Sequence, residues 1–130
     1  MGKIIKKAVY NKDKTECLKI GYFKNDKGEI QIIQMPPTIT KVPKTLPKKI
    51  TNLSKAFGNN INITISGIEY WDVSNIKDMS YMFYGAEKFN QPIGKWNTSN
   101  VEDMSYMFNG ATSFDKEKHW NKSLSKSRTR

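Results

Sequence analysis

A 25-residue repeat constrains the fold of this chain more than any other feature of its sequence. Residues 71–95 read WDVSNIKDMSYMFYGAEKFNQPIGK, and residues 96–119 read WNTSNVEDMSYMFNGATSFDKEKH. Aligned at an offset of 25, the two segments are identical at 12 of their first 20 positions. Repeats of this period are typical of architectures in which each unit buries its apolar face against its neighbours.

A weaker copy of the unit precedes these two, over residues 46–70, and a further copy begins at Trp120. In the weaker copy the apolar positions recur at an offset of 26, as Ile50, Leu53, Ala56, Phe57 and Ile63 in place of Ile76, Met79, Met82, Phe83 and Phe89. The pattern is lost after Phe114, where Gln91-Pro92-Ile93 is replaced by Lys116-Glu117-Lys118. We therefore expect about three units between residues 46 and 120: residues 46–70, 71–95 and 96–119.

The apolar spacing inside a unit predicts a short amphipathic helix followed by a short strand. The intervals of three, three, one and three residues place one set of side chains on one helix face, namely Ile76, Met79, Met82, Phe83 and Ala86. Asn75 is the expected N-cap, Asp78 the acidic residue of the first turn, and Gly85 the left-handed C-cap. The predicted fold is an α/β, leucine-rich-repeat-like solenoid with a helix and a short strand in each 25-residue coil.

The N-terminal third, residues 1–45, has a different pattern. Two β-prone runs, residues 17–23 and 29–35, flank the turn sequence Asn25-Asp26-Lys27-Gly28, and a proline-rich segment follows. We expect a β-hairpin here that caps the first repeat, because a stack of repeats needs its open apolar end covered. Residues 121–130 are expected to form a basic, disordered tail.

The net charge of +10 lies at the two ends of the chain. Residues 1–50 carry 12 Lys and 4 acids, and residues 116–130 carry 6 basic residues and 1 acid, whereas residues 51–115 carry 4 Lys and 7 acids. Polyanion binding, to nucleic acid or a heparin-like polymer, is therefore an alternative function, through Lys3, Lys6, Lys7, Lys41, Lys44, Lys48, Lys49, Lys126, Arg128 and Arg130. Against nucleic acid stands the scarcity of arginine, with 2 Arg and 20 Lys, since arginine supplies the bidentate contacts to bases and phosphates.

No motif indicates an enzyme. The single cysteine, Cys17, excludes an intramolecular disulfide, and the single histidine, His119, has no partner in sequence that would make it a base or a ligand. We predict no catalytic residue, no cofactor and no metal site. No run of residues is long and apolar enough to span a membrane, and no secretory leader is visible, which favours the cytoplasm.

A pair of tyrosines is the best candidate for a binding surface. On the predicted helix, Tyr81, Tyr84 and Lys77 fall opposite the buried face, and Tyr106 is the equivalent of Tyr81 in the next unit. Exposed aromatic side chains are enriched at protein interfaces. These residues are the predicted partner-binding set, although the rings could instead cover the groove between adjacent helices. Lys77 and Glu102 occupy equivalent positions and could pair across coils.

The unit W-[DN]-x-S-N-[IV]-x-D-M-S-Y-M-F-x-G-A-x-x-F-[ND] resembles the repeat of mycoplasma-type surface proteins described as BspA-like leucine-rich-repeat proteins. The segment VPKTLPKKITNLSKAF and the hairpin before it resemble the N-terminal module of that family. The resemblance implies a non-enzymatic solenoid that is displayed on the cell surface and takes part in adhesion or host interaction. A third possibility is a truncated paralogue without a function of its own, because the fourth copy begins and then stops.

Overall fold

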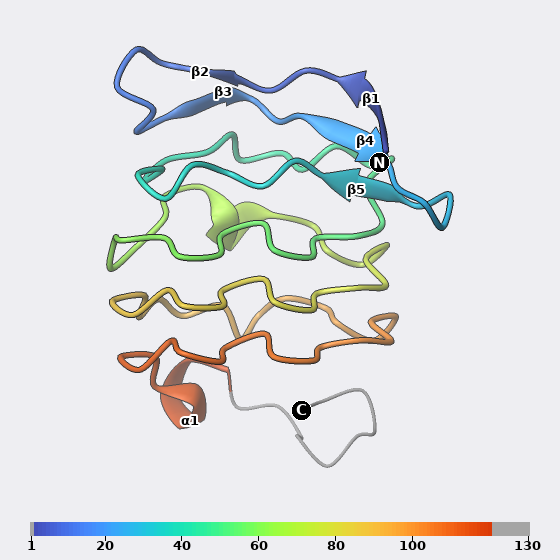
Figure 1. Cartoon of the computed structure of the whole chain (residues 1–130). Coiled ribbons are helices and arrows are strands. Elements are labelled where there is room, and N and C mark those ends of the chain that lie inside the picture. Colours follow the sequence, from blue (N-terminus) through green and yellow to red (C-terminus); the bar gives the residue numbers. More distant parts are fainter. Residues whose placement is uncertain (1, 121–130) are drawn as a thin grey trace.

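The computed structural model describes residues 2–120 of the 130-residue chain and contains five short strands at its N-terminal end (Figure 1). The strands are β1 (Lys3–Lys6), β2 (Val9–Tyr10), β3 (Cys17–Lys19), β4 (Tyr22–Lys24) and β5 (Ile30–Ile32). They form two small antiparallel sheets, one in the order β1-β4-β5 and one of β2 with β3. The described helices are a 3-10 turn, η1 (Ile68–Tyr70), and the four-residue α1 (Lys116–His119).

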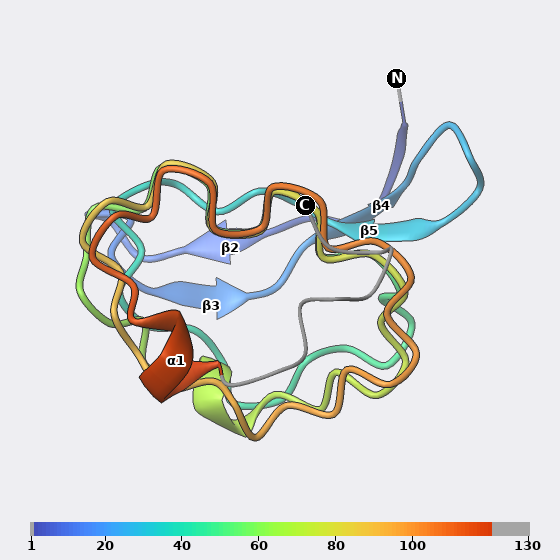
Figure 2. The ribbon, with the colours of Figure 1, turned by 90° about the horizontal axis from the view of Figure 1, so that it is seen from below.

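Below the strands the chain passes through successive layers of irregular backbone, and Figure 2 shows that their traces lie over one another. Isolated parallel bridges join residues about 25 apart, from Asn52 to Asp78 and from Asp78 to Asp103. A second line of bridges runs from Glu16 through Lys41 to Ser66. The equivalent residues of successive units therefore lie above one another.

The predicted helix-plus-strand solenoid is wrong. Residues 76–86 form a series of turns instead of a helix, and residues 89–96 form no strand. Asn75 and Gly85 consequently cap no helix, although Gly85 does adopt the left-handed conformation, with φ of 71°. The named strands lie in the two antiparallel sheets of the N-terminal third, and the units themselves contain almost no regular secondary structure.

The turns reproduce a helix-like spacing because their hydrogen bonds alternate between local and interlayer partners. The N–H groups of Met82, Tyr84 and Ala86 donate to the carbonyl oxygens three residues earlier. The intervening N–H groups donate to the layer below: Met79 to Asp103, Tyr81 to Ser105, Phe83 to Met107 and Gly85 to Asn109. Three-residue turns repeat apolar side chains at intervals of three, as one face of a helix also does.

The same alternation joins the preceding layer to this one. The N–H groups of Leu53, Lys55, Phe57 and Asn59 donate to the carbonyl oxygens of Asp78, Ser80, Met82 and Tyr84. Peptide units are thereby linked into vertical columns in which every amide points the same way. In the lowest of these layers the corresponding N–H groups, those of Met104, Tyr106, Phe108 and Gly110, donate to no residue that the structure describes. Within the described residues, each of these columns therefore ends in a backbone N–H group.

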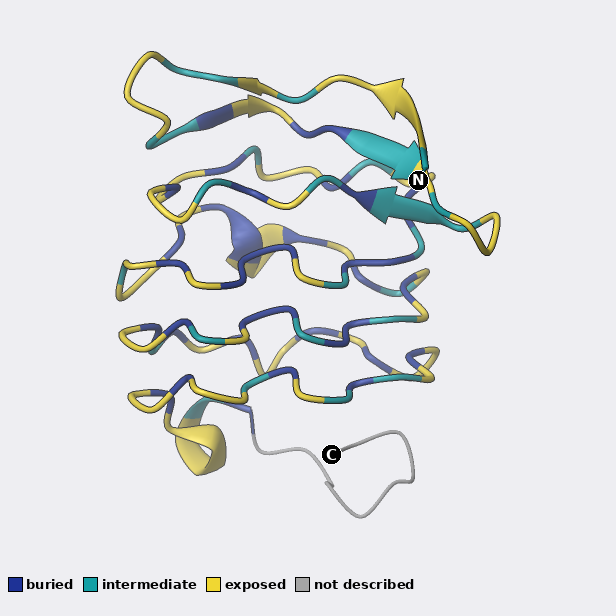
Figure 3. Cartoon of the chain, in the orientation of Figure 1, coloured by how far each residue is buried: buried dark blue, intermediate teal, exposed yellow. Residues whose placement is uncertain are grey.

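Buried residues recur in each layer (Figure 3), and the apolar ones among them form one hydrophobic cluster. Phe83 is fully buried and stacks on Phe57, Phe89 and Phe108, with ring centroids 5.8, 4.2 and 5.7 Å away. The side chains predicted to form the buried face, Ile76, Met79, Met82, Phe83 and Ala86, are all buried. In the degenerate unit the predicted core residue Ile63 is 61% exposed, whereas Ile65 is buried.

The β2–β3 hairpin lies at the upper end of the layers and crosses the interior of their outline (Figures 1 and 2). Cys17 and Ile20 are buried in the core, and Tyr10 packs against it. The predicted turn at residues 25–28 is present, since β4 and β5 pair on either side of it. The run 17–23 is not one strand, however, because buried Gly21 separates β3 from β4, and β3 pairs with β2 instead. A Cβ at Gly21 would lie 2.5 Å from the Ala8 nitrogen, so the chain can pass there only with glycine.

Candidate functional site

Three of the predicted binding residues meet on the outside of the layers. The rings of Tyr81 and Tyr106 stack with centroids 5.1 Å apart, and the ring of Tyr84 lies 5.5 Å from that of Tyr81. Tyr84 and Tyr106 are 43% and 41% exposed, and Tyr81 is half-buried between them. Their hydroxyl groups form no hydrogen bond with any residue in the described range. We call these three residues the tyrosine column.

The backbone under the column is left-handed. Tyr81 and Tyr106 both have φ of 58°, a conformation that costs a side chain with a Cβ about 1–2 kcal/mol. Lys55 holds the equivalent position in the preceding layer with φ of 65°. Because lysine occupies the same conformation there, the turn itself does not require tyrosine. The contribution of the tyrosines therefore comes from their rings, which either stack on each other or contact a partner.

Lys77, the fourth predicted residue, is exposed but contacts none of the three rings. The predicted ion pair of Lys77 with Glu102 is not formed. Instead, the Glu102 N–H donates to the Lys77 carbonyl oxygen at 2.7 Å, as part of the interlayer bonding. Lys77 was predicted to lie beside the tyrosines because of its position on a helix, and residues 76–86 form no helix.

A polar column runs beside the tyrosine column, through Asn52, Asp78 and Asp103. Each of these side chains accepts a hydrogen bond from the N–H two residues later, at 2.7–2.8 Å, which closes a turn. Asp78 also accepts from the Ser80 hydroxyl at 2.6 Å. Asp78 and Asp103, predicted as helix-start carboxylates, thus stabilise turns, and their positions follow from the repeat.

The upper end of this polar column holds Glu29. Its carboxylate accepts hydrogen bonds from the side chains of Asn25 at 2.9 Å and Asn52 at 3.1 Å. The hydrogen bond from Asn25 is the main cause that lowers the pKa of Glu29, and Asn52, Lys27 and Lys77 act in the same direction against partial desolvation. The carboxylate is therefore a fixed acceptor and not a proton carrier near neutral pH.

The described lysines of the polyanion alternative lie on the surface, and two of them already have partners. Lys41 forms an ion pair with Glu16 at 3.8 Å, and the Lys44 ammonium lies 4.8 Å from the centroid of the Tyr70 ring. Lys48 and Lys49 are exposed. Lys126, Arg128 and Arg130, together with the predicted disordered tail at 121–130, lie outside the described residues. Polyanion binding stays a prediction.

Open grooves flank the layers, but none gathers a reactive set of side chains. One groove of about 740 Å³ lies beside Trp96 and Trp120 and is lined by Glu69, Tyr70, Ile93, Lys95 and His119 among others. Within residues 2–120 no three or more His, Cys, Asp or Glu residues are grouped in a way that could hold a metal ion. None of the helices in that range has the length and hydropathy needed to cross a membrane.

Sequence reasoning named lysines of the N-terminal strands but missed the exposed aliphatic side chains near them. Ile4, Ile5, Val9 and Leu18 are 57%, 47%, 41% and 49% exposed. The signal that could have found them is the alternation along β3, where buried Cys17 places the neighbouring Leu18 on the outer side of the hairpin.

Comparison with known proteins gives one match. The model of a family described as "Mycoplasma protein of unknown function, DUF285" matches residues 39–129, which include all three 25-residue units. No curated protein and no solved structure matches the chain. The matched segment is the greater part of the sequence and contains the tyrosine column. The chain therefore belongs to the DUF285 family of mycoplasma proteins of unknown function.

Proposed function

We propose that this protein is a non-enzymatic interaction module that binds another protein through Tyr81, Tyr84 and Tyr106. The observation that carries the proposal is the tyrosine column itself, three clustered rings on the surface with hydroxyls that no described residue engages. Tyrosine combines a large apolar ring with a polar group and loses little conformational entropy on binding, which makes it frequent among the residues that dominate interface energies.

The position of the rings supports a role beyond packing. Tyr81 and Tyr106 lie in left-handed turns that lysine also occupies in the layer above, so the fold tolerates other residues at this site. The rings are anchored on a backbone tied by interlayer hydrogen bonds, the Tyr81 N–H to the Ser105 carbonyl at 3.0 Å among them. A rigid aromatic surface binds with little ordering cost.

The proposal includes the relation of the 25-residue unit to BspA-like repeats and, with it, display on a cell surface and a host or cell-surface protein as the partner. The motif of the repeat is what supports this part, and the family match supports only the mycoplasma-type family. The proposal does not require a helix and a strand in each unit, because stacked turns also expose the tyrosine rings.

Photo-crosslinking on cultured animal cells tests the proposal. A photoreactive phenylalanine derivative in place of Tyr84 should form covalent adducts with one surface protein, whereas the same group in place of Tyr70, an exposed tyrosine outside the column, should not. Tyr81→Ser with Tyr106→Ser should weaken the binding by at least about thirtyfold, because two interface tyrosines commonly contribute about 2 kcal/mol or more. Equal adduct formation at positions 84 and 70, or unchanged binding of the double variant, would refute the proposal.

A further inference from the structure

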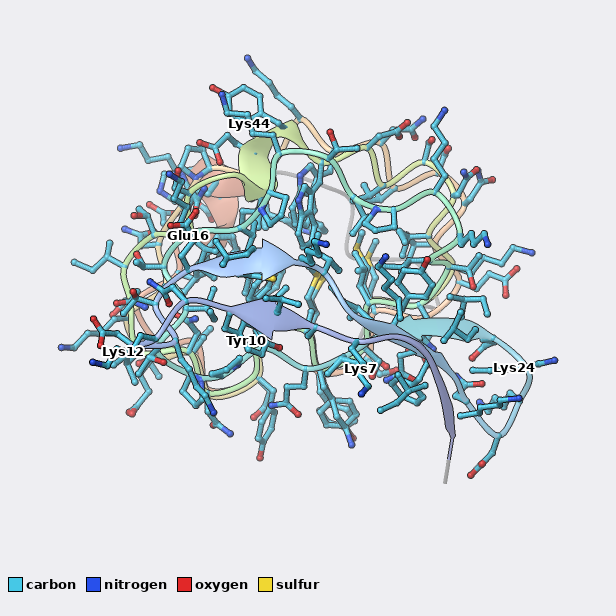
Figure 4. All side chains as sticks on the ribbon, turned by 90° about the horizontal axis from the view of Figure 1, so that it is seen from above. Lys7, Tyr10, Lys12, Glu16, Lys24 and Lys44 are labelled. Carbon is cyan, nitrogen blue, oxygen red and sulfur yellow. The ribbon has the colours of Figure 1, made fainter. Side chains whose placement is uncertain are left out.

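The N-terminal segment carries exposed lysines and exposed aliphatic side chains that are close together in sequence, and the tyrosine column does not use them. Four aliphatic side chains, Ile4, Ile5, Val9 and Leu18, are 41–57% exposed. Seven lysines lie on the same segment: Lys3, Lys6, Lys7, Lys12, Lys14, Lys19 and Lys24. We call these eleven residues the cap face. In Figure 4, which looks onto the upper end of the molecule, Lys12, Lys7 and Lys24 lie across it from one side to the other.

The cap face is strongly basic. All seven lysines are exposed, and within the described part of the chain none of them forms an ion pair. Residues 2–24 contain two acids, Asp13 and Glu16, and Glu16 is already paired with Lys41. An exposed surface with this excess of positive charge attracts an anionic counterpart, and the attraction acts within about 10 Å at moderate salt.

Lysines on an edge strand also have a simpler explanation. β1 is the outer strand of its sheet, and lysine is common on such strands because it discourages pairing with a second chain. That explanation accounts for Lys3 and Lys6 but not for the aliphatic side chains between and beside them. The pairing of β1 with β4 shifts register between Ile4 and Lys6, which leaves Ile5 unpaired, and all four residues of β1 are exposed.

We propose that the cap face is a membrane-surface site that binds a bilayer containing anionic lipid. Lysine ammonium groups would contact the lipid phosphates while Ile4, Ile5, Val9 and Leu18 enter the boundary of the acyl chains, the combination that peripheral membrane proteins use. Nucleic acid and heparin-like polymers match the charge but offer no apolar phase to the aliphatic side chains. The charge and the exposed aliphatic area together therefore favour a lipid surface.

The core side of the β2–β3 hairpin keeps the part of this surface that carries Val9 and Leu18 rigid. Cys17 and Ile20 are buried beneath it, Tyr10 packs against the core, and the Cys17 N–H donates to the Lys41 carbonyl at 2.8 Å. The hairpin would bind as a preformed surface and would not need to fold on the lipid. Because the hairpin lies at one end of the layers, the tyrosine column on their side would stay accessible on a bound molecule (Figure 1).

Vesicle flotation with the full chain tests the proposal. The protein should float with vesicles containing about 30% phosphatidylglycerol and not with phosphatidylcholine vesicles, and high salt should release it. Lys6→Gln with Lys7→Gln should weaken binding about 25-fold, because each lysine near an anionic surface strengthens partition about fivefold. Ile4→Ser with Ile5→Ser should weaken it about tenfold through the loss of buried apolar area.

Matched controls lie elsewhere on the surface. Lys88→Gln with Lys95→Gln removes the same charge from the lower layers, and Ile61→Ser with Ile63→Ser removes two aliphatic side chains that are 57% and 61% exposed. Both control variants should bind within about twofold of the original chain. Thermal unfolding of each variant checks that the fold is retained.

Three results would overturn the proposal. The first is failure to float with the anionic vesicles. The second is an equal loss of lipid binding for the isoleucine variant at positions 4 and 5 and the isoleucine variant at positions 61 and 63. If the protein also binds heparin or DNA through Lys6 and Lys7, the surface is a site for polyanions. The third is a dimer in light scattering that Ile4→Ser with Ile5→Ser dissociates, without lipid binding, which would indicate that β1 pairs with a second copy.

Discussion

Removing the ring of Phe83 tests how the layers hold together. Phe83 is fully buried and stacks on one ring of the layer above, one of its own layer and one of the layer below. Phe108, the equivalent residue one unit later, is half-buried and lies in the lowest of these layers. The two residues have the same sequence context but different burial, so they form a matched pair.

Phe83→Ala should cost about 3–5 kcal/mol, the range for a buried phenylalanine whose cavity cannot close. Phe108→Ala should cost at least about 1 kcal/mol less, since part of its ring is already in water and the lower edge can relax. A domain of this size has a total stability of about 5–15 kcal/mol, so the Phe83 variant should lose a large fraction of it.

Urea unfolding followed by tryptophan fluorescence measures both variants. The midpoint should fall further for Phe83→Ala than for Phe108→Ala, with little change in the slope of the transition. Equal losses for the two variants, or a loss below about 1 kcal/mol for Phe83→Ala, would contradict a core that is continuous from layer to layer.

Two glycines and the single cysteine give further predictions. Gly67→Ala should cost clearly more stability than Gly28→Ala: both have positive φ, but a Cβ at Gly67 would clash with the Val42 backbone carbonyl of the neighbouring layer, whereas at Gly28 the nearest atom is 3.8 Å away. Equal costs in thermal melts would argue against the close approach of the layers. Burial raises the pKa of Cys17 from 9.0 to about 11, so the native thiol should react with a thiol reagent at pH 8 much more slowly than the unfolded chain. Because the folded state holds this proton more tightly, stability should be greatest below pH 9 and fall between pH 9 and pH 11, and Cys17→Ala should reduce that fall. A fall unaffected by Cys17→Ala would assign the effect to other groups, Tyr10 among them, whose pKa is also raised by burial.

The sequence predicts which side chains are buried better than it predicts the backbone that buries them. Met79, Met82 and Phe83 lie in the core as their spacing indicates. A turn closed every three residues and a helix give nearly the same apolar intervals, so periodicity could not distinguish them. The local evidence for turns was present in Asp78-Met79-Ser80, an aspartate placed to accept the N–H two residues later.

The candidate site was predictable as a set of tyrosines but not as a geometry. The repeat itself places Tyr81 next to Tyr106, and their rings do stack. Lys77 was included with them because it falls on the same face of the predicted helix, but the folded chain has no helix there. The lysines of the cap face were predicted as a basic end of the chain, but its exposed aliphatic side chains were not, because sequence alone does not show that β1 covers no layer.

The central claim is that each unit is a layer of turns whose alternate amides donate to the next layer. Scalar couplings across hydrogen bonds, measured by NMR on the isotope-labelled chain, identify donor and acceptor directly. The account predicts a coupling from the Tyr81 nitrogen to the Ser105 carbonyl carbon and from the Phe83 nitrogen to the Met107 carbonyl carbon, with no partner for the Tyr106 N–H among residues 2–120. Couplings from Tyr81 to Lys77 and from Tyr106 to Glu102, the four-residue pattern of a helix, would contradict it.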